Sequence, residues 1–245
     1  NWSGVTLWEA TDDLVKKHPE ALGRVRSVKF SKFNLKSGET LPKEVGNLKF
    51  LESFSVASNE NNQIREVNLG DEICSLKYLK NLTVQAYGLT QLPANFINLG
   101  KSLESLNLVS NNFNKLSDIT NIVNEKNFPK LRNLILYAQR RTDVVTNIAS
   151  LGEMNASGVY VYNNYPIGLY GKVNAGTADR QALLKLLTWD KLNTLELSYC
   201  FLEGELPTDE EMTEALEAAG KATRYTKSDF STNKEDYLDK LVGDT

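Results

Sequence analysis

The sequence of 245 residues is poor in the residue types that usually carry catalysis or metal binding. It has one histidine, His18, and two cysteines, Cys74 and Cys200. A nucleophilic triad would have to use His18, which lies in a charged N-terminal segment, and a Cys/His zinc site would need all three of these widely spaced residues. We therefore predict no enzyme activity and no cofactor, and we interpret both cysteines as small buried residues.

The sequence also lacks an excess of basic residues and a long apolar run. The 28 Lys and Arg residues against 31 Asp and Glu residues give a net charge of -3, so nothing indicates a phosphate-binding footprint for nucleic acid. No run of about 18 apolar residues is long enough to span a membrane. The start at Asn1 shows neither an initiator Met nor a signal peptide. Neither nucleic-acid binding nor a transmembrane segment is expected in this stretch of chain.

A leucine ladder is the main pattern that the sequence does contain. In L-x-x-L-x-L the fourth and sixth positions point to one face of a short strand and the residues between them to the other. One such strand cannot bury its apolar face alone, so successive copies must stack as a parallel sheet. The clearest copies are Leu79-x-x-Leu82-x-Val84, Leu103-x-x-Leu106-x-Leu108, Leu131-x-x-Leu134-x-Leu136 and Leu192-x-x-Leu195-x-Leu197.

The spacing of the ladder predicts about seven repeats. The steps are 26, 28, 24, 28, 25 and 36 residues, and most match a solenoid period of 20 to 29 residues. The last step indicates an insertion near 166–190, with an amphipathic helix over 178–189. The first ladder positions are Val25, Leu51, Leu79, Leu103, Leu131, Ala156 and Leu192.

The ninth ladder position predicts how the turn after each strand is stabilised. A buried polar side chain there can form hydrogen bonds with the open backbone of the turn. We expect this role for Asn59, Asn111, Asn164 and Cys200, whereas Phe33, Tyr87 and Gln139 break the series.

The segments between the ladders resemble the leucine-rich repeat (LRR) family. The stretch from Leu41-Pro42 through Val45-Gly46 to Leu48 is similar to the long subtype with L/I-P-x-x-I/V-G-x-L, and residues 91–99 repeat it. Residues 202–207 resemble the L-x-G-x-L-P turn of that subtype, and the resemblance spans about 24–207. It implies an α/β fold, a right-handed solenoid with a concave parallel sheet and convex irregular or short helical segments.

The resemblance also carries an expectation about location. Residues 2–7 resemble the W-x-G-V segment that caps such solenoids, but the usual capping cysteines are absent. This absence argues against a secreted plant receptor and favours the bacterial members, which the resemblance implies are exported or surface-anchored. We therefore expect an extracytoplasmic, cell-surface location, although no signal or anchor is seen.

Three regions follow along the chain. We predict that residues 1–23 form an N-terminal cap with a short helix from Thr11 and that residues 24–207 form the repeats. Residues 208–245 are predicted to form a C-terminal cap. Its acidic helix opens with a capping box at Thr208 and Glu211 and continues to about Ala219, with Gly220 as its stop.

The concave face is the candidate binding site, because tyrosines gather on its predicted second half. Tyrosine supplies a large contact area with a polar tip and is common in binding sites. Alternatively, the rings only stabilise the sheet by stacking on their cross-strand neighbours. The predicted ligand-binding residues are Ile135, Tyr137, Tyr160, Tyr162 and Tyr199.

We therefore predict a non-catalytic recognition module that binds a protein or peptide through its concave face. Carbohydrate binding is the alternative, since several rings on a rigid face could stack against sugars. A second alternative is that the chain is the recognition part of a larger enzyme.

Overall fold

A computed structural model describes most of the chain. The described residues are 3–36, 38–58, 67–139, 152–154, 156, 160–162, 173–174, 176–198, 200, 202 and 204–221.

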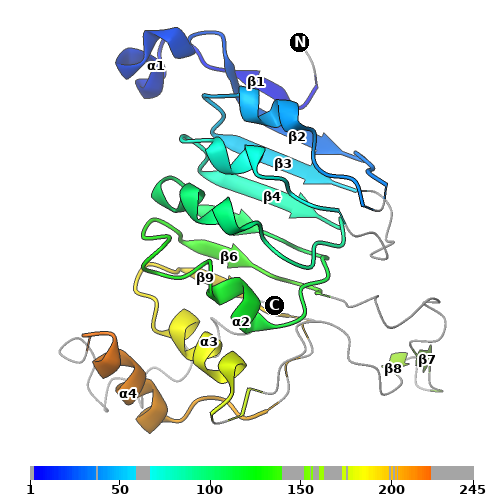
Figure 1. Ribbon diagram of the computed structural model, residues 1–245, viewed down its shortest axis with the longest axis vertical. Helices are drawn as coiled ribbons and strands as arrows, with labels where there is room; N and C mark the ends of the chain where they lie inside the picture. Colours follow the sequence, from blue (N-terminus) through cyan, green and yellow to red (C-terminus); the bar gives the residue numbers. More distant parts are fainter. Residues whose placement is uncertain are drawn as a thin grey trace.

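One seven-stranded sheet organises the molecule (Figure 1). Its order is β1-β2-β3-β4-β5-β6-β9, so the strands follow one another along the chain except for the step from β6 to β9. Within this sheet each strand from β2 to β6 is parallel to the next, and β6 is parallel to β9. β1 is antiparallel to β2 at the edge. The bounds are Val5–Leu7 (β1), Val25–Ser31 (β2), Ser53–Ala57 (β3), Asn81–Gln85 (β4), Ser105–Asn107 (β5), Asn133–Ile135 (β6) and Thr194–Glu196 (β9).

The ladder register is confirmed. The fourth ladder positions are paired from strand to strand and form one column in the core, each at most 5% exposed. Burying one such side chain stabilises the fold by about 1.5–3 kcal/mol, so a shift of one residue would place the whole column in water. The column consists of Val28, Phe54, Leu82, Leu106, Leu134 and Leu195.

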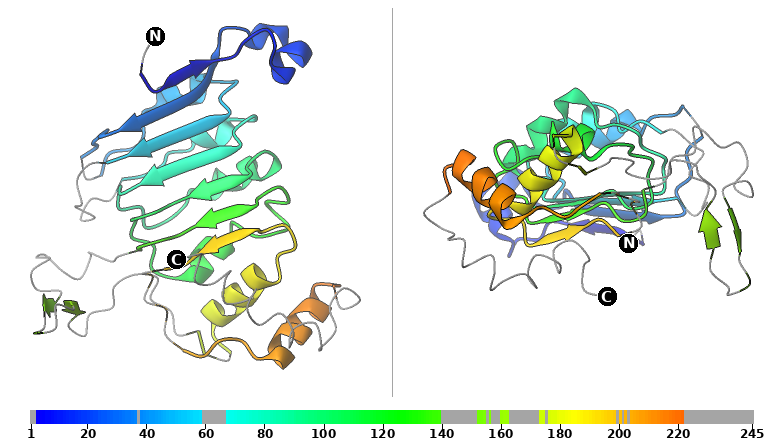
Figure 2. Two further views of the ribbon diagram at one scale, coloured as in Figure 1. Left: turned by 180° about the vertical axis from the view of Figure 1, so that it is seen from behind. Right: turned by 90° about the horizontal axis from the view of Figure 1, so that it is seen from below.

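Short helical segments cover one face of the sheet and leave the other face open (Figures 1 and 2). Pro42 and Pro93 immediately precede two of these segments, where a missing N–H costs nothing and the fixed φ suits a helical start. The segments are the 3-10 helices η2 (Lys43–Asn47), η3 (Glu72–Ser75) and η4 (Ala94–Lys101) and the α-helix α2 (Leu116–Thr120).

The N-terminal segment packs as a small unit at one end of the sheet. It contains α1 (Asp13–Lys17) and η1 (Pro19–Ala21), and Trp8, Val15 and Ala21 form its buried core. The indole Nε1 of Trp8 donates a hydrogen bond of 2.8 Å to the carbonyl oxygen of Phe50 and so ties this unit to the second coil. The helix begins one residue later than predicted, with Asp12 rather than Thr11 at the N-cap.

Two helices lie at the opposite end of the solenoid (Figure 1). α3 (Ala178–Leu187) confirms the helix predicted over 178–189, and α4 (Asp209–Ala218) confirms the acidic helix. Thr208 and Glu211 form the predicted capping box, and Gly220 follows with a φ of 71°. Arg180 of α3 is 4% exposed in its side chain and forms an ion pair with Glu211.

The predicted repeat at Ala156 is wrong. β6 pairs directly with β9, and Leu134 lies next to Leu195. The intervening β7 (Gly152–Met154) and β8 (Tyr160–Tyr162) form a separate antiparallel pair. The insertion therefore includes this pair as well as α3, and the main sheet has one parallel strand fewer than predicted. At positions one, four and six this segment offers only Ala and Val, whereas residues 192–197 offer three leucines and bury more apolar surface in the last coil.

The ninth ladder position behaves as predicted at Asn111, which is fully buried. Its Oδ1 accepts hydrogen bonds from the backbone N–H groups of Tyr87 and Leu89, each at 3.1 Å. Its Nδ2 donates to the carbonyl oxygens of Val84 and Leu108, at 2.7 and 2.9 Å. One side chain thus joins two successive coils, while Asn59 and Asn164 lie outside the described residues.

Other residues at the ninth position serve the same turn with different chemistry. Gln139 is fully buried and its Nε2 donates to the carbonyl oxygens of Leu108 and Leu136, so the prediction that it breaks the series is wrong. The thiol of Cys200 donates to Leu136 at 3.0 Å, as expected. Tyr87 is buried too, with its hydroxyl donating to the carbonyl oxygen of Phe33.

Candidate binding surface on the sheet

The uncovered face of the sheet, which we call the open face, corresponds to the predicted concave surface (Figure 2). The residues between the inward ladder positions point to it, and the strand register places them in columns. One column consists of Lys29, Ser55, Thr83, Asn107, Ile135 and Glu196. A second begins with Ser31, Ala57 and Gln85, again paired across neighbouring strands.

The open face is built mainly from small polar side chains. Serine, threonine and asparagine occupy its first coils, and most of them are half-buried. These groups both donate and accept hydrogen bonds but carry no charge, so they can pair with peptide groups without a large desolvation cost. Ionised groups stand near the ends, with Lys29 on β2 and Glu196 on β9.

The structure brings together only part of the predicted site. Ile135 lies on β6 between Asn107 and Glu196, and Tyr137 follows in the same coil, half-buried. The prediction that Tyr160 and Tyr162 lie in the main sheet is wrong, because both belong to β8 in the separate pair. Tyr199 lies outside the described residues. The binding roles of all five residues stay predictions.

The two thiols are buried, as predicted, and neither is in a disulfide. Burial raises the pKa of Cys74 to about 12, with nearby Asp71 and Glu72 acting in the same direction. Burial likewise raises the pKa of Cys200 to about 12. Both side chains are therefore thiols at neutral pH, and the thiolate is the nucleophilic form.

His18 contacts a tyrosine and a glutamate in the described structure. The ring of His18 lies half-exposed near the start of the sheet, where its Nε2 is 3.2 Å from the hydroxyl of Tyr78 and its Nδ1 is 3.4 Å from Glu20. Among the described residues, no three His, Cys, Asp or Glu side chains are grouped as they would be around a metal ion.

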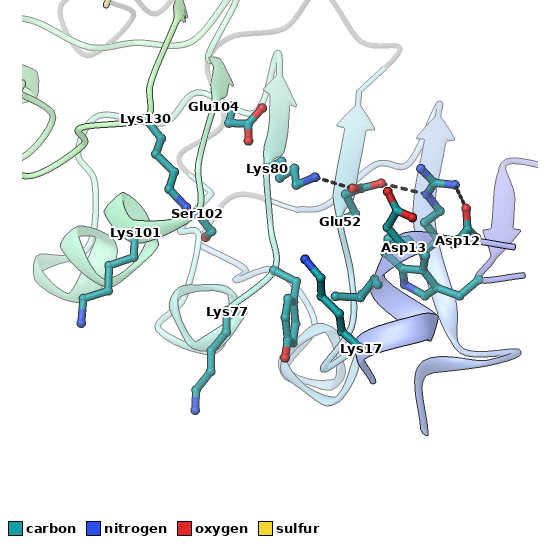
Figure 3. Close-up of a pocket in the computed structure, with 14 residues that line it drawn as sticks. Asp12, Asp13, Lys17, Glu52, Lys77, Lys80, Lys101, Ser102, Glu104 and Lys130 are labelled. Atoms are coloured by element: carbon teal, nitrogen blue, oxygen red, sulfur yellow. Dashed lines mark hydrogen bonds and ion pairs between the residues drawn. The ribbon is translucent and has the colours of Figure 1, made fainter. Parts of the chain in front are cut away.

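The sequence reasoning missed a row of alternating charges at the start of the strands. Arg26, Glu52, Lys80, Glu104 and Arg132 occupy the second ladder position of successive coils. The Nε of Arg26 lies 2.8 Å and the Nζ of Lys80 lies 2.9 Å from the two carboxylate oxygens of Glu52 (Figure 3). Burial disfavours the ionised carboxyl, but these two hydrogen bonds outweigh it and hold the pKa of Glu52 below its ordinary value.

In the sequence this row appears as a charge at the second ladder position whose sign alternates from one repeat to the next. Residues 26 to 28 positions apart can form ion pairs only when successive coils stack against each other. The interaction therefore depends on the stacking of the coils. The main-chain bonds confirm that the coils are aligned there, since the N–H of Glu52 donates to Arg26 and that of Lys80 to Glu52, both at 2.8 Å.

The repeat period, the aligned parallel strands and the helical layer define this chain as a leucine-rich repeat solenoid. No protein-family model matches the sequence, and no curated protein matches it at a significant level. None of the helices in the described part of the chain is both long and apolar enough to cross a bilayer.

Solved structures with a similar arrangement are LRR proteins or ectodomains. The LRR ectodomain of the receptor kinase SOBIR1 from Arabidopsis thaliana has 18% identity and a TM-score of 0.44, covering 84% of this chain and 85% of that one. The BIR2 ectodomain from the same plant has 16% identity and a TM-score of 0.39, covering 57% of this chain and 64% of its own, less than two thirds. The LRR protein LIC12759 of Leptospira interrogans has 23% identity and a TM-score of 0.31, covering 47% of this chain and 32% of its own.

Proposed function

We propose that this chain is a non-catalytic recognition module that binds a protein or peptide across the open face of its sheet. The observation that carries the proposal is the open face itself, a continuous set of aligned columns that no described helix covers (Figure 2). By the resemblance to bacterial LRR proteins, we place the module outside the cytoplasm, at the cell surface.

The composition of the open face favours a peptide over a sugar. Sugar binding was suggested by several aromatic rings on one surface, but two of the predicted tyrosines belong to a different sheet. The remaining hydrogen-bonding side chains around Thr83 and Asn107 suit main-chain amides, and Ile135 and Tyr137 add apolar contact at one end.

Selection from a displayed random-peptide library, followed by affinity measurement, tests the proposal. We expect selected peptides to bind the wild-type chain and to lose most of their affinity for Thr83→Arg, because a long charged side chain then stands in the middle of the open face. Tyr137→Ala should weaken binding by about 2 kcal/mol, roughly thirtyfold in Kd, if the ring is an anchor.

Asn98→Arg is the matched control, because Asn98 is exposed on η4, on the helical side of the molecule. Unchanged affinity for both open-face variants, or an equal loss in Asn98→Arg, would contradict binding on this face. A glycan array probed with the same proteins separates the alternative, since sugar binding that is lost in Tyr137→Ala would favour a carbohydrate ligand.

A further inference from the structure

A row of exposed lysines lines one edge of the solenoid. Each of five coils that are adjacent in the main sheet carries one, placed one or two residues before its first ladder leucine. The chain turns into its strand at this point, so equivalent positions in stacked coils share one edge of the molecule. We call this surface the lysine edge, and its members are Lys49, Lys77, Lys101, Lys130 and Lys191.

The lysine edge adjoins a solvent-open pocket of about 550 Å³ that is lined by the N-terminal unit and the first coils (Figure 3). Lys77, Lys101 and Lys130 line it from the edge, and Lys17 contributes from α1. Lys77 and Lys101 extend in the same direction from neighbouring coils in Figure 3. Tyr78, which stacks on Phe50 with ring centroids 5.5 Å apart, adds an aromatic ring to the lining.

The acidic side chains of the pocket are already largely neutralised. Asp12 pairs with Arg26, Glu52 with Arg26 and Lys80, and Asp13 with Lys16. Glu104 is the remaining carboxylate of the lining. Within the described part of the chain no ion pair involves Lys17, Lys77, Lys101 or Lys130. This edge is therefore locally positive although the chain as a whole carries a charge of -3.

We propose that the lysine edge binds an acidic peptide segment of a partner protein, laid across the coils. This surface is distinct from the open face, so the inference goes beyond the function proposed above. Neighbouring strands lie about 4.8 Å apart and alternate side chains of an extended peptide about 6.7 Å apart, and the flexible four-carbon stems of lysine cover this difference.

The mixed lining favours a peptide over a uniformly charged polysaccharide. A dense polyanion would meet the carboxylate of Glu104, which no ion pair among the described residues neutralises, as well as the lysines, and like charges at close range are destabilising. A peptide can place separate carboxylates on the lysines and leave neutral residues near the acids. It can also use the ring of Tyr78 and the hydroxyl of Ser102 for apolar and hydrogen-bonding contacts.

Fluorescence anisotropy with a labelled peptide of about 12 residues, alternating Glu and Ser, tests this proposal at low and high salt. The wild-type chain should bind this probe, bind the matching Gln-Ser peptide much more weakly, and lose affinity between about 20 and about 500 mM NaCl as the charges are screened. The combined variant Lys77→Gln, Lys101→Gln, Lys130→Gln should lose about tenfold in affinity, since each exposed ion pair contributes little alone and three are removed together.

The matched control is Lys36→Gln, Lys43→Gln, Lys185→Gln, which removes the same charge from exposed positions elsewhere. Its affinity for the probe should stay within about twofold of wild type. Both variants should melt as the wild type does, because substitutions at exposed positions without buried contacts change stability little. Equal losses in the two variants, or no loss in the edge variant, would overturn the proposal. So would heparin fragments that bind more tightly than the peptide and depend on the same lysines. Thr83→Arg should leave probe binding intact, which keeps this test separate from that of the open face.

Discussion

At the residue scale, the turn after each strand explains why polar groups are buried in an apolar core. Among the described residues, the eighth ladder position has a left-handed backbone in four coils, with φ between 56° and 62° at Lys32, Ala86, Ser110 and Ala138. This conformation is costly for residues other than glycine, and it leaves main-chain groups without sheet partners. The side chain that follows, Asn111 or Gln139, supplies the missing hydrogen bonds from inside the core.

Asn111→Ala is expected to lower the free energy of unfolding by about 1–3 kcal/mol, because it leaves the N–H groups of Tyr87 and Leu89 buried without their acceptor. Urea denaturation followed by circular dichroism measures this change. Asn98→Ala, at an exposed position of η4, is the control and should leave the midpoint in place. An unchanged midpoint in Asn111→Ala would show that these hydrogen bonds contribute nothing to stability.

At the element scale, the helical layer requires close contact between coils. η4 ends beside the turn that leads to β6, and a Cβ added at Gly100 would lie 1.8 Å from the carbonyl oxygen of Asn127. Gly100 does not have a positive φ, so the reason for glycine at this position is space rather than backbone conformation. The contact sets how closely two neighbouring coils can stack on the helical side.

Gly100→Ala is therefore expected to destabilise the chain by about 1–3 kcal/mol or more, as overpacking of a backbone contact does. Gly46→Ala is the matched comparison, because its added Cβ would lie 3.1 Å from the Cβ of Glu72, a contact that a small shift relieves. Thermal unfolding of both variants measures the difference. Equal losses in the two would indicate that the space at Gly100 is not the cause.

At the scale of the whole molecule, specific contacts hold the segments at both ends of the solenoid in place. At the N-terminal end Arg26 of β2 lies 4.6 Å from the ring centroid of Trp8 and joins the N-terminal unit to the sheet. At the other end Arg180 donates hydrogen bonds to Glu211 and to the carbonyl oxygens of Val173, Glu205 and Leu206. One guanidinium thus connects α3, which lies before the last strand, to the chain that follows it.

This contact predicts a pH dependence of stability. The hydrogen bond from Arg180 lowers the pKa of Glu211 from its ordinary value, so the folded state favours the carboxylate. The resulting stabilisation is complete above the unfolded pKa of about 4.3 and is lost as the pH falls through the lower folded value. Wild type should therefore be more stable than Glu211→Gln at pH 7, and the gap should shrink on acidification below about pH 4.3.

Denaturation midpoints of the two proteins from pH 7 to pH 3 measure this gap. Glu214→Gln is the control, since Glu214 is exposed on the same helix. A gap between wild type and Glu211→Gln that is independent of pH would contradict the role of the carboxylate. Glu214→Gln should not reproduce the pH-dependent gap of Glu211→Gln, and the same gap in both variants would indicate a general charge effect of the acidic helix.

The local patterns were readable from the sequence because each depends on a few consecutive residues. The ladder period set the strand register, the helix over 178–189 followed from its apolar spacing, and the capping box at Thr208 followed from the order of its residues. The role of Asn111 followed from its place at the ninth position of the ladder. These features need only the alternation of a strand, the periodicity of a helix or the geometry of a turn.

Only the tertiary structure decided which coil follows β6. The Ala156 segment and the leucines at 192–197 both fit a strand locally, and the choice between them depends on which side chains fill the last layer of the core. The same holds for the charged row around Glu52 and for the lysine edge. Successive members lie 24 to 29 residues apart in sequence, and 61 apart from Lys130 to Lys191, and they form one surface only because stacked coils bring them side by side.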